Sequence, residues 1–191
     1  FFEKSNVYIE KGVTIGRDTK LSRGTIVKEG ATIGVECFIG NNTLIRENVT
    51  IGNKTKIGFC NVIESNAKIG SNTRTQSFCM ISEHSNIGNE VFLGPYWNNP
   101  ADNTIGMPNG EYKPNPAKIE NKCRFGSHVV ITPGKVIEEG TIIGAGSIVT
   151  KSTEPDSLYY GCPAIRKDIV KDVNKDFNDS SVPYRTVTKE M

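Results

Sequence analysis

Residues 33–58 read Ile-Gly-Val-Glu-Cys-Phe-Ile-Gly-Asn-Asn-Thr-Leu-Ile-Arg-Glu-Asn-Val-Thr-Ile-Gly-Asn-Lys-Thr-Lys-Ile-Gly, with an isoleucine at every sixth position. The same spacing continues outward, and we call each such position an anchor. The anchors of the first series are Ile9, Ile15, Leu21, Val27, Ile33, Ile39, Ile45, Ile51, Ile57, Ile63, Ile69, Thr75, Ile81, Ile87 and Leu93, and those of the second are Ile119, Phe125, Ile131, Ile137, Ile143 and Val149. A period of six over this length is the hexapeptide repeat of a parallel β-helix.

Each hexad predicts a short strand followed by a corner. The residue two positions before the anchor is repeatedly small or β-branched, and residues two apart on a strand face the same side. Glycine often follows the anchor directly, and we expect it to supply a positive φ at the corner, as do the asparagines Asn41, Asn53 and Asn89 that come next. Three hexads close a triangular coil of 18 residues, so the 21 hexads predict about seven coils.

Composition excludes several classes of partner. The 191 residues carry a formal net charge of +2, which gives no argument for nucleic acid or a membrane surface. No stretch approaches the roughly 20 apolar residues of a membrane span, and no basic-then-apolar leader opens the chain. We expect a cytoplasmic location, although a start at Phe1 leaves a removed leader open. Cys37, Cys79 and Cys123 stand two residues before an anchor, so we expect core thiols rather than disulfides.

Two segments interrupt the repeat. Residues 95–116 lie between the two series of anchors and carry the only tryptophan, which predicts a loop excursion of the kind that bears function on a rigid scaffold. After residue 151 the repeat ends. We expect a connector over residues 152–162, a short helix over residues 164–173 because of its apolar spacing, and a polar tail to residue 191. The expected domains are therefore the β-helix, residues 1–151, and the C-terminal segment, residues 152–191.

Three short runs add to the hexads, namely Glu90-Val-Phe-Leu-Gly-Pro95, Ile143-Gly-Ala-Gly-Ser-Ile-Val-Thr-Lys151 and Gly161-Cys-Pro-Ala164. With them, residues ~7 to ~167 resemble the hexapeptide-repeat, left-handed β-helix acyltransferases. The subgroup that they resemble is the nucleotide-sugar N-acetyltransferases of the UDP-2-acetamido-3-amino-2,3-dideoxyglucuronate N-acetyltransferase type. The resemblance implies a homotrimer in surface polysaccharide biosynthesis, with acetyl-CoA and a nucleotide sugar between neighbouring prisms and no metal.

The two histidines are the candidate bases for an acetyl transfer. His84 and His128 both stand three residues before an anchor, a parity that points away from the core. His84 is the favoured general base, with Glu83 holding the substrate ammonium or orienting the imidazole. Many relatives have their histidine one position earlier, where Glu83 stands, and the departing thiolate can itself accept the proton. His128 lies on a different face and is expected to bind substrate or to act as the base, meeting His84 only across a subunit interface.

The loop supplies candidates for acceptor binding. A side-chain amide of Asn98 or Asn99 can bond the sugar or the thioester oxygen, and the alternative is that both only form a turn. Tyr96 and Trp97 can stack on a base or a sugar ring, or they can pin the loop to the helix.

The resemblance also implies a CoA site. Its backbone contacts fall on Gly126, Gly144, Ala145, Gly146, Pro163 and Ala164. Lys151, Arg166 and Lys167 are the expected phosphate ligands near that end of the chain.

Three other functions stay open. A γ-type carbonic anhydrase shares the fold but needs three imidazoles around zinc, and the chain has two histidines. A β-helix without catalysis is the second alternative. The third is O-acetylation of a sugar or a small molecule on the same fold.

Overall fold

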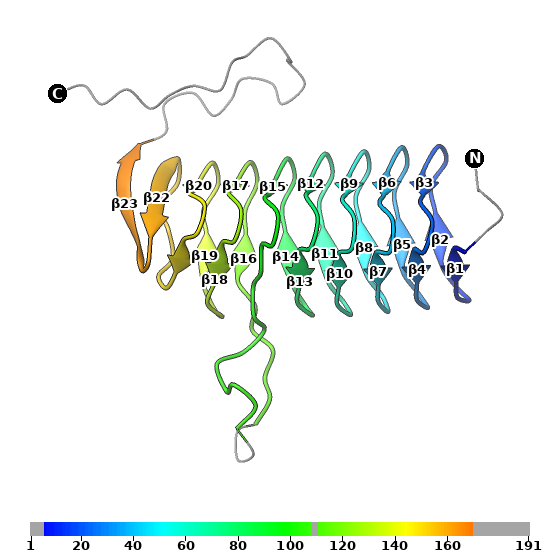
Figure 1. Ribbon diagram of the computed structural model, residues 1–191, viewed down its shortest axis with the longest axis horizontal. Coiled ribbons are helices and arrows are strands. Elements are labelled where there is room, and N and C mark those ends of the chain that lie inside the picture. The colour runs from blue at the N-terminus through cyan, green and yellow to red at the C-terminus, as the bar shows by residue number, and fades with distance from the viewer. Residues whose placement is uncertain (1–5, 108–110, 170–191) are drawn as a thin grey trace, which may run out of the picture.

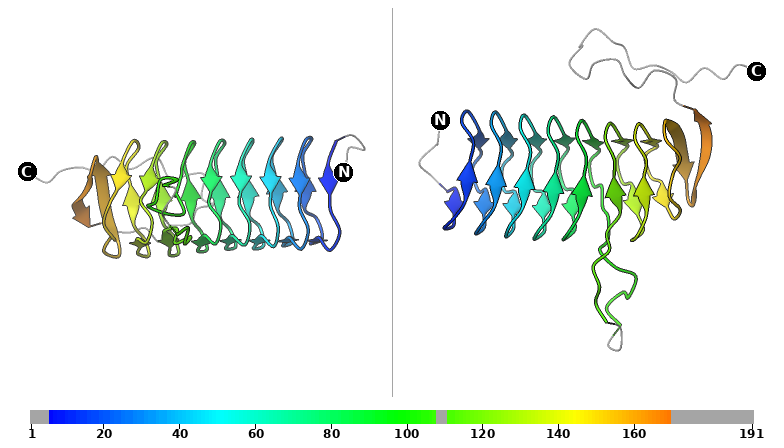
Figure 2. Two further views of the ribbon diagram at one scale, coloured as in Figure 1. Left: turned by 90° about the horizontal axis from the view of Figure 1, so that it is seen from below. Right: turned by 180° about the vertical axis from the view of Figure 1, so that it is seen from behind.

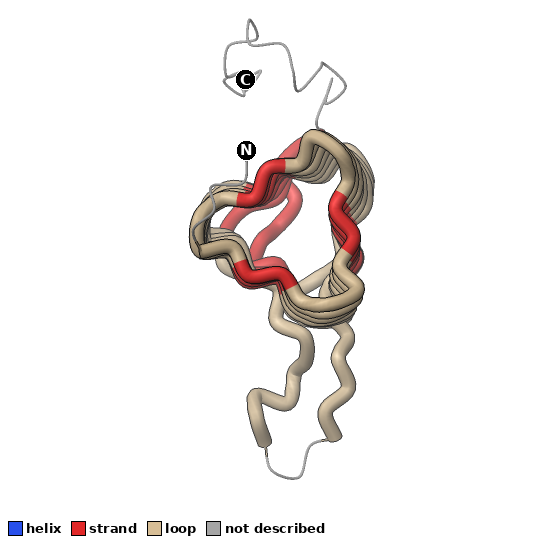
Figure 3. Tube along the Cα trace, turned by 90° about the vertical axis from the view of Figure 1, so that its right-hand side faces the viewer, coloured by secondary structure: helices blue, strands red, loops and turns tan. Residues whose placement is uncertain are grey.

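The computed structural model describes residues 6–107 and 111–169. Within them the chain winds as a left-handed parallel β-helix of about eight turns, which confirms the predicted fold class. Figure 1 shows the coils stacked side by side along one axis, and Figure 3 shows their triangular cross-section. None of the described residues forms a helix that could cross a lipid bilayer.

Three parallel sheets form the sides of the prism, and we call them A, B and C. Sheet A contains β1 (Tyr8–Ile9), β4 (Ile26–Val27), β7 (Leu44–Ile45), β10 (Val62–Ile63), β13 (Met80–Ile81), β18 (Val130–Ile131) and β21 (Ile148–Val149). Sheet B contains β2 (Thr14–Ile15), β5 (Thr32–Ile33), β8 (Thr50–Ile51), β11 (Lys68–Ile69), β14 (Asn86–Ile87), β16 (Lys118–Ile119) and β19 (Val136–Ile137). Sheet C contains β3 (Lys20–Leu21), β6 (Phe38–Ile39), β9 (Lys56–Ile57), β12 (Arg74–Thr75), β15 (Phe92–Leu93), β17 (Arg124–Phe125), β20 (Ile142–Ile143), β22 (Ser157–Gly161) and β23 (Ala164–Ile169).

The register of the sheets follows directly from the period. Tyr8 pairs with Ile26, and Ile26 with Leu44, so each coil advances 18 residues before a strand meets its neighbour. The chain visits sheets A, B and C in turn, and we name the corners between them AB, BC and CA. Residues 18 apart therefore form columns that run the length of the prism, except across the insertion.

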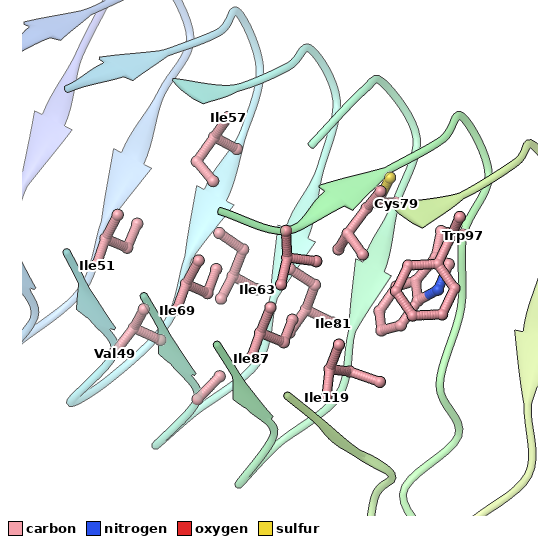
Figure 4. Packing of buried hydrophobic residues seen from close by; sticks show 14 of the residues in the cluster. Val49, Ile51, Ile57, Ile63, Ile69, Cys79, Ile81, Ile87, Trp97 and Ile119 are labelled. Atoms are coloured by element: carbon pink, nitrogen blue, oxygen red, sulfur yellow. The ribbon is translucent and has the colours of Figure 1, made fainter. Parts of the chain in front are cut away.

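The core is a stack of anchors filled in by the second inward residue of each hexad. Ile45, Ile63 and Ile81 are fully buried in one such column, and Cys37, Cys79 and Cys123 are buried as predicted. Figure 4 shows the aliphatic side chains pointing toward one another inside the coils. All five cysteines are free thiols. The hydrophobic effect of this continuous core is what holds strands of two residues in register.

The glycines that follow the anchors have a different role from the one predicted. The positive φ occurs three residues before every anchor except Ile119, for example at Asn42, Asn48 and His84 (φ 55°, 57° and 57°). The glycine after the anchor is needed for close approach instead. A Cβ on Gly58 would lie 2.6 Å from the carbonyl carbon of Gln76 in the next coil, closer than any non-bonded contact allows. Stacked coils can come together at corners BC and CA because no side chain separates them.

One hexad was missed in the sequence. Asn98 bridges Met80 and Val130 in sheet A, so residues 94–99 form a coil segment with Asn99 at the anchor position and Trp97 as the second inward residue. The excursion therefore begins after Asn99 rather than at residue 95. This hexad and the added strand β22 raise the predicted seven coils to about eight. A polar anchor hid the hexad from a search for aliphatic residues.

The predicted C-terminal helix is wrong over the described residues. Residues 164–169 form strand β23, which pairs antiparallel with β22 and closes sheet C as a hairpin at the end of the prism. Ser157 and Tyr159 of β22 are buried, whereas β23 is largely exposed. The apolar spacing there reflects one face of a hairpin. Residues 170–173 of the expected helix and the tail lie outside the described residues.

Candidate functional site

The insertion and the first candidate base share corner AB. The chain leaves the prism after Asn99 in sheet A and returns at β16 in sheet B. Residues 100–107 and 111–116 therefore stand out from this corner, as Figures 2 and 3 show. Corner AB of the preceding coil is Ser82-Glu83-His84-Ser85, between β13 and β14. His84 is exposed and Glu83 is half-buried. The fold therefore places both predicted catalytic residues directly beside the base of the insertion.

A buried amide fixes the corner that carries these residues. Asn99 is fully buried, and its Oδ1 accepts a hydrogen bond of 3.2 Å from the backbone N–H of Ser82. Its Nδ2 donates a 2.8 Å hydrogen bond to the Ser85 hydroxyl, which in turn donates to the Ser82 carbonyl. Both ends of the amide are thus engaged in holding residues 82–85. Asn99 is not available to bond a ligand, contrary to the expectation, and acts as a positioning residue.

The insertion reaches back to corner AB through a tyrosine. The hydroxyl of Tyr112 donates a short hydrogen bond to the carboxylate of Glu83. The insertion is also tied at its base, where the Asn115 N–H donates to the Ala101 carbonyl (2.6 Å) and the Gly134 N–H donates to the Asn115 carbonyl (2.7 Å). Tyr112 was not predicted, because no repeat places it opposite residue 83.

Farther out, the insertion presents apolar side chains. Ile105 is 88% exposed and Met107 is 64% exposed. Side chains of this kind on a protruding loop are suited to contact a neighbouring molecule.

The second histidine lies at corner CA, on the opposite edge of sheet A. Its ring stacks on Tyr96 with centroids 4.7 Å apart, and Tyr96 stacks on Phe78 at 5.0 Å. We call Phe78, Tyr96 and His128 the corner stack. All three stand three residues before an anchor in successive coils and share the left-handed backbone (φ 61°, 60° and 57°). The stack was not predicted, because Tyr96 and Phe78 come into line only once the hexad 94–99 is counted.

The remaining predicted loop residues divide between core and surface. Trp97 is fully buried against Phe125, with ring centroids 5.7 Å apart, so its indole packs in the core and is not exposed to stack on a base or a sugar ring. Its Nε1 is buried with no hydrogen-bond partner among the described residues. The indole fills the coil in which Asn99 replaces the usual aliphatic anchor. Asn98 lies between these two inward residues and therefore presents its side chain on the outer face of sheet A.

The predicted CoA contacts gather at corner CA, near the end of the prism. Gly126 and Gly144 follow the anchors of β17 and β20, and Ala145 and Gly146 are exposed beside them. The N–H of Gly161 donates a 3.1 Å hydrogen bond to the Ser147 hydroxyl. This contact brings the turn of the β22–β23 hairpin, with Pro163 and Ala164, next to that corner.

The predicted phosphate ligands do not form one cluster. Lys151 follows β21 and stands at corner AB, across sheet A from the glycines. Arg166 on β23 is paired with Glu154 at 2.9 Å and also donates from Nε to Ser157. The ammonium of Lys167 lies 4.9 Å from the centre of the Tyr160 ring. Of the three, Lys167 alone meets two conditions. It lies close to the hairpin turn, and it has no ion pair among the described residues.

The repeat and the fold of this chain are similar to those of known proteins. Residues 116–151 match the family model described as the hexapeptide repeat of succinyl-transferase. These residues form the coils from β16 to β21. The UDP-N-acetylglucosamine acyltransferase from Campylobacter jejuni superposes with a TM-score of 0.55 at 17% identity, covering 86% of this chain and 73% of that one. At this identity the likeness is one of fold.

Two curated relatives are closer in sequence over shorter stretches. The galactoside O-acetyltransferase of Escherichia coli (strain K12) is 38% identical over 105 residues, which cover 50% of each chain. A Staphylococcus aureus (strain Mu50) protein, whose name marks it as a candidate acetyltransferase, is 37% identical over 78 residues, 41% of this chain and 38% of its own. The chain thus spans half or less of the length of these relatives. Among the described residues no group of three or more histidine, cysteine or acidic side chains is arranged to hold a metal ion.

Proposed function

We propose that the protein is an acetyl-CoA-dependent N-acetyltransferase that acts on an amino group of a nucleotide-linked sugar, in the cytoplasmic stage of surface polysaccharide biosynthesis. The observation that carries this proposal is the shared corner AB. A rigid coil presents Glu83 and His84 there, and the insertion binds the same corner through Tyr112. Support from the comparisons is that the similar proteins include named acetyl- and acyltransferases.

The reaction assigns a separate task to each group. The amine nitrogen attacks the thioester carbonyl, a C–N bond forms, and the C–S bond breaks to release the CoA thiolate. His84 accepts the proton that the amine loses and returns it to the thiolate, which contributes roughly 10²–10⁴ to the rate. The Glu83 carboxylate binds the acceptor as its ammonium before this step. The ammonium releases one proton to solvent to give the free amine, which Glu83 holds beside the imidazole. Tyr112 keeps that carboxylate oriented by its hydrogen bond.

The outer face of sheet A favours the proposed homotrimer. Its outward side chains form an apolar column of Tyr8, Ile26, Leu44, Val62, Met80, Val130 and Ile148, broken only by Asn98. Tyr8, Met80 and Ile26 are 58%, 45% and 38% exposed. The equivalent positions of sheet B are mainly threonine, lysine and asparagine. A long apolar column on an outer face, exposed or half-buried along its length, is suited to a protein interface.

In the proposed trimer, sheet A of each subunit faces the three-fold axis, and this packing completes the site. With parallel prisms, corner AB of one subunit then faces corner CA of the next, in a heterologous contact that closes into a ring. The insertion and His84 would lie opposite the neighbour's corner stack. The exposed Ile105 and Met107 of the insertion are placed to contact that neighbouring subunit.

The test is a mass-spectrometric transfer assay with acetyl-CoA and a panel of UDP- and dTDP-linked 3-amino and 4-amino sugars. His84→Asn is the sharpest variant, because Asn48 and Asn66 occupy the same left-handed position in the same column. We expect kcat to fall by about 10²-fold or more in this variant, with unchanged thermal stability. A matched control is Glu29→Gln, because Glu29 has the corner position of Glu83 three coils earlier. Equal rates for parent and His84→Asn would remove His84 as the base.

The second candidate function is O-acetylation. The observation in its favour is the 38% identity to the galactoside O-acetyltransferase. The same assay, run with galactosides and with hydroxyl-only nucleotide sugars, separates the two, because an amine acceptor alone gives an alkali-stable amide product.

A further inference from the structure

The corner stack ends at an empty position. Phe78, Tyr96 and His128 occupy the same site in three successive coils of corner CA, and in the next coil that site is Gly146. Gly146 keeps the left-handed backbone (φ 69°), and a Cβ built on it would meet no described atom within 4 Å. The exposed His128 ring therefore has one face covered by Tyr96, while a glycine leaves the other side without a side chain.

We propose that this open position over His128 receives the planar base of a nucleotide, which continues the stack as a fourth ring. The centroid spacings of 5.0 and 4.7 Å match the strand spacing, so a ring at the level of Gly146 would lie one further step, about 4.8 Å, above the imidazole. Offset stacking at this separation is the arrangement that aromatic rings prefer. Stacking on a side chain accepts any base, because every base has a π-face.

The surroundings fit a nucleotide better than an isolated ring. Ala145 is exposed beside the open position, and the Gly161–Ser147 hydrogen bond holds the β22–β23 turn next to it. Lys167, on the strand that leaves this turn, carries a positive charge suited to phosphate. The ring stack and the neighbouring cation thus offer a partner to the base and to the phosphate of a nucleotide.

The position along the prism agrees with a cofactor that reaches the candidate base. Phe78 lies in the same coil as His84, and Gly146 lies three coils farther on, about 14 Å at the strand spacing. An extended pantetheine arm covers such a distance. This part of the inference rests on the proposed function, whereas the stacking of a base on His128 does not.

The base can come from CoA or from the nucleotide sugar, and calorimetric titrations distinguish them. Each of CoA, UDP and dTDP is titrated into the parent protein, His128→Asn and His128→Phe. Both substitutions fit the backbone, because Asn42 and Phe78 hold the same position in this column at φ 55° and 61°. We expect His128→Asn to weaken base binding about 5- to 150-fold, the range for loss of one stacked ring, and His128→Phe to retain it.

A second pair of variants tests the open position itself. Gly146→Asn places a side chain where the base would lie and should weaken the same ligand. Gly12→Asn is its control, because Gly12 has the same φ (70°) at a remote corner and a Cβ there meets nothing closer than 3.8 Å. S-acetyl-N-acetylcysteamine is a thioester without a nucleotide base. It should bind or react equally well with the parent protein and with His128→Asn.

The outcomes separate the two proposals. Weaker binding of CoA alone assigns the position to adenine, and weaker binding of UDP or dTDP alone assigns it to the acceptor. Nucleotide binding that depends on His128 in a protein without transfer activity keeps the stack and removes the proposed function. Unchanged affinity of His128→Asn for all three nucleotides, or no binding of any to the parent, overturns the base-stacking proposal.

Discussion

The Tyr112 hydroxyl donates a hydrogen bond to the Glu83 carboxylate, and this contact joins the insertion to the rigid coil. The two residues lie 29 positions apart in the chain. At its base the insertion is closed on itself by the Ala101–Asn115 hydrogen bond and joined to the prism by the Gly134–Asn115 hydrogen bond. The orientation of the insertion over corner AB therefore depends on a residue that is itself a candidate for acceptor binding.

We predict that Tyr112→Phe raises KM for the amine acceptor about tenfold with a smaller effect on kcat. Hydrogen bonds to charged groups contribute roughly 1.5–3 kcal/mol, and the exposure of Tyr112 places this one toward the low end. Steady-state kinetics with the acceptor identified in the transfer assay measures the change. Lys113→Ala is the control, since the Lys113–Glu111 pair is exposed and lies in the same segment of the insertion. Identical KM values for Tyr112→Phe and the parent would show that the contact has no part in acceptor binding.

Asn99→Leu is predicted to lower kcat about tenfold or more while leaving the protein folded. Leucine restores an apolar anchor, but the Ser82 N–H and the Ser85 hydroxyl lose their partner, so residues 82–85 can move. A buried polar group left unsatisfied costs roughly 1–3 kcal/mol. Asn61→Leu is the matched control, because Asn61 accepts from the Cys79 N–H and donates to the Gln76 carbonyl at corner CA. An unshifted pH–rate profile at full activity in Asn99→Leu would contradict the positioning role.

The sequence predicted the regular coils well because each anchor repeats one physical requirement, a buried aliphatic residue every sixth position. It failed where that requirement was met by other means. Trp97 and Asn99 fill one coil with a large indole and a hydrogen-bonded amide, so an aliphatic search passed over them. The sequence of β23 predicts a helix instead of a strand because a short apolar pattern does not distinguish the two.

The candidate site was predicted less completely for a related reason. His84 stands within a regular hexad, three residues before an anchor, so its outward placement followed from the period. Tyr112 comes from an irregular insertion whose path no pattern specifies. The corner stack needed the correct count of coils between Tyr96 and His128. Site geometry that depends on insertions is thus accessible only from the folded chain.

Gly58→Ala is predicted to destabilise the protein although it removes no contact. The added Cβ would lie 2.6 Å from Gln76 backbone atoms, so two coils must separate at corner CA. Overpacking of this kind typically costs about 1–3 kcal/mol, which lowers the thermal midpoint by several degrees in a chain of this size. Ser22→Ala is the control, since Ser22 holds the same hexad position of the same corner and already carries a side chain. A midpoint equal to that of the parent would contradict the close-approach role of these glycines.

The cysteines should differ sharply in reactivity. Burial raises the pKa of Cys79 to about 11 and that of Cys123 to about 12, whereas Cys162 is exposed on the hairpin turn. At pH 8 a disulfide reagent should modify Cys162 within minutes and leave Cys79 and Cys123 protected until the protein unfolds. Rapid labelling of every thiol in the folded protein would contradict the buried core. The fast phase of thiol modification should disappear in a Cys162→Ser variant, which assigns that phase to Cys162.

The same raised pKa values predict a loss of stability at alkaline pH. In the unfolded chain both thiols ionise with a pKa near 8.5, whereas the folded state keeps Cys79 and Cys123 protonated. Their contribution to stability is therefore fully present below about pH 8.5 and is lost as the pH rises toward 11–12. Urea unfolding of the parent and of a Cys79→Ala, Cys123→Ala double variant measures it. The decline between pH 8.5 and 11 should be smaller in the double variant, and parallel declines would contradict the assignment.

Sheet A supplies the last prediction, which concerns assembly. Val62 is the outward residue of β10, in the middle of the apolar column. Val62→Lys should convert the proposed trimer to monomers, because it would place an ammonium in the proposed dry interface. Thr50→Lys is the matched control, because Thr50 is the outward residue of β8 in sheet B. Sedimentation velocity separates the two states. We expect the monomeric variant to keep its coil structure by circular dichroism and to lose transfer activity, since corner AB then has no neighbouring corner CA. A trimer that persists in Val62→Lys would place the subunit contact on another face, and an active monomer would show that one prism holds the whole site.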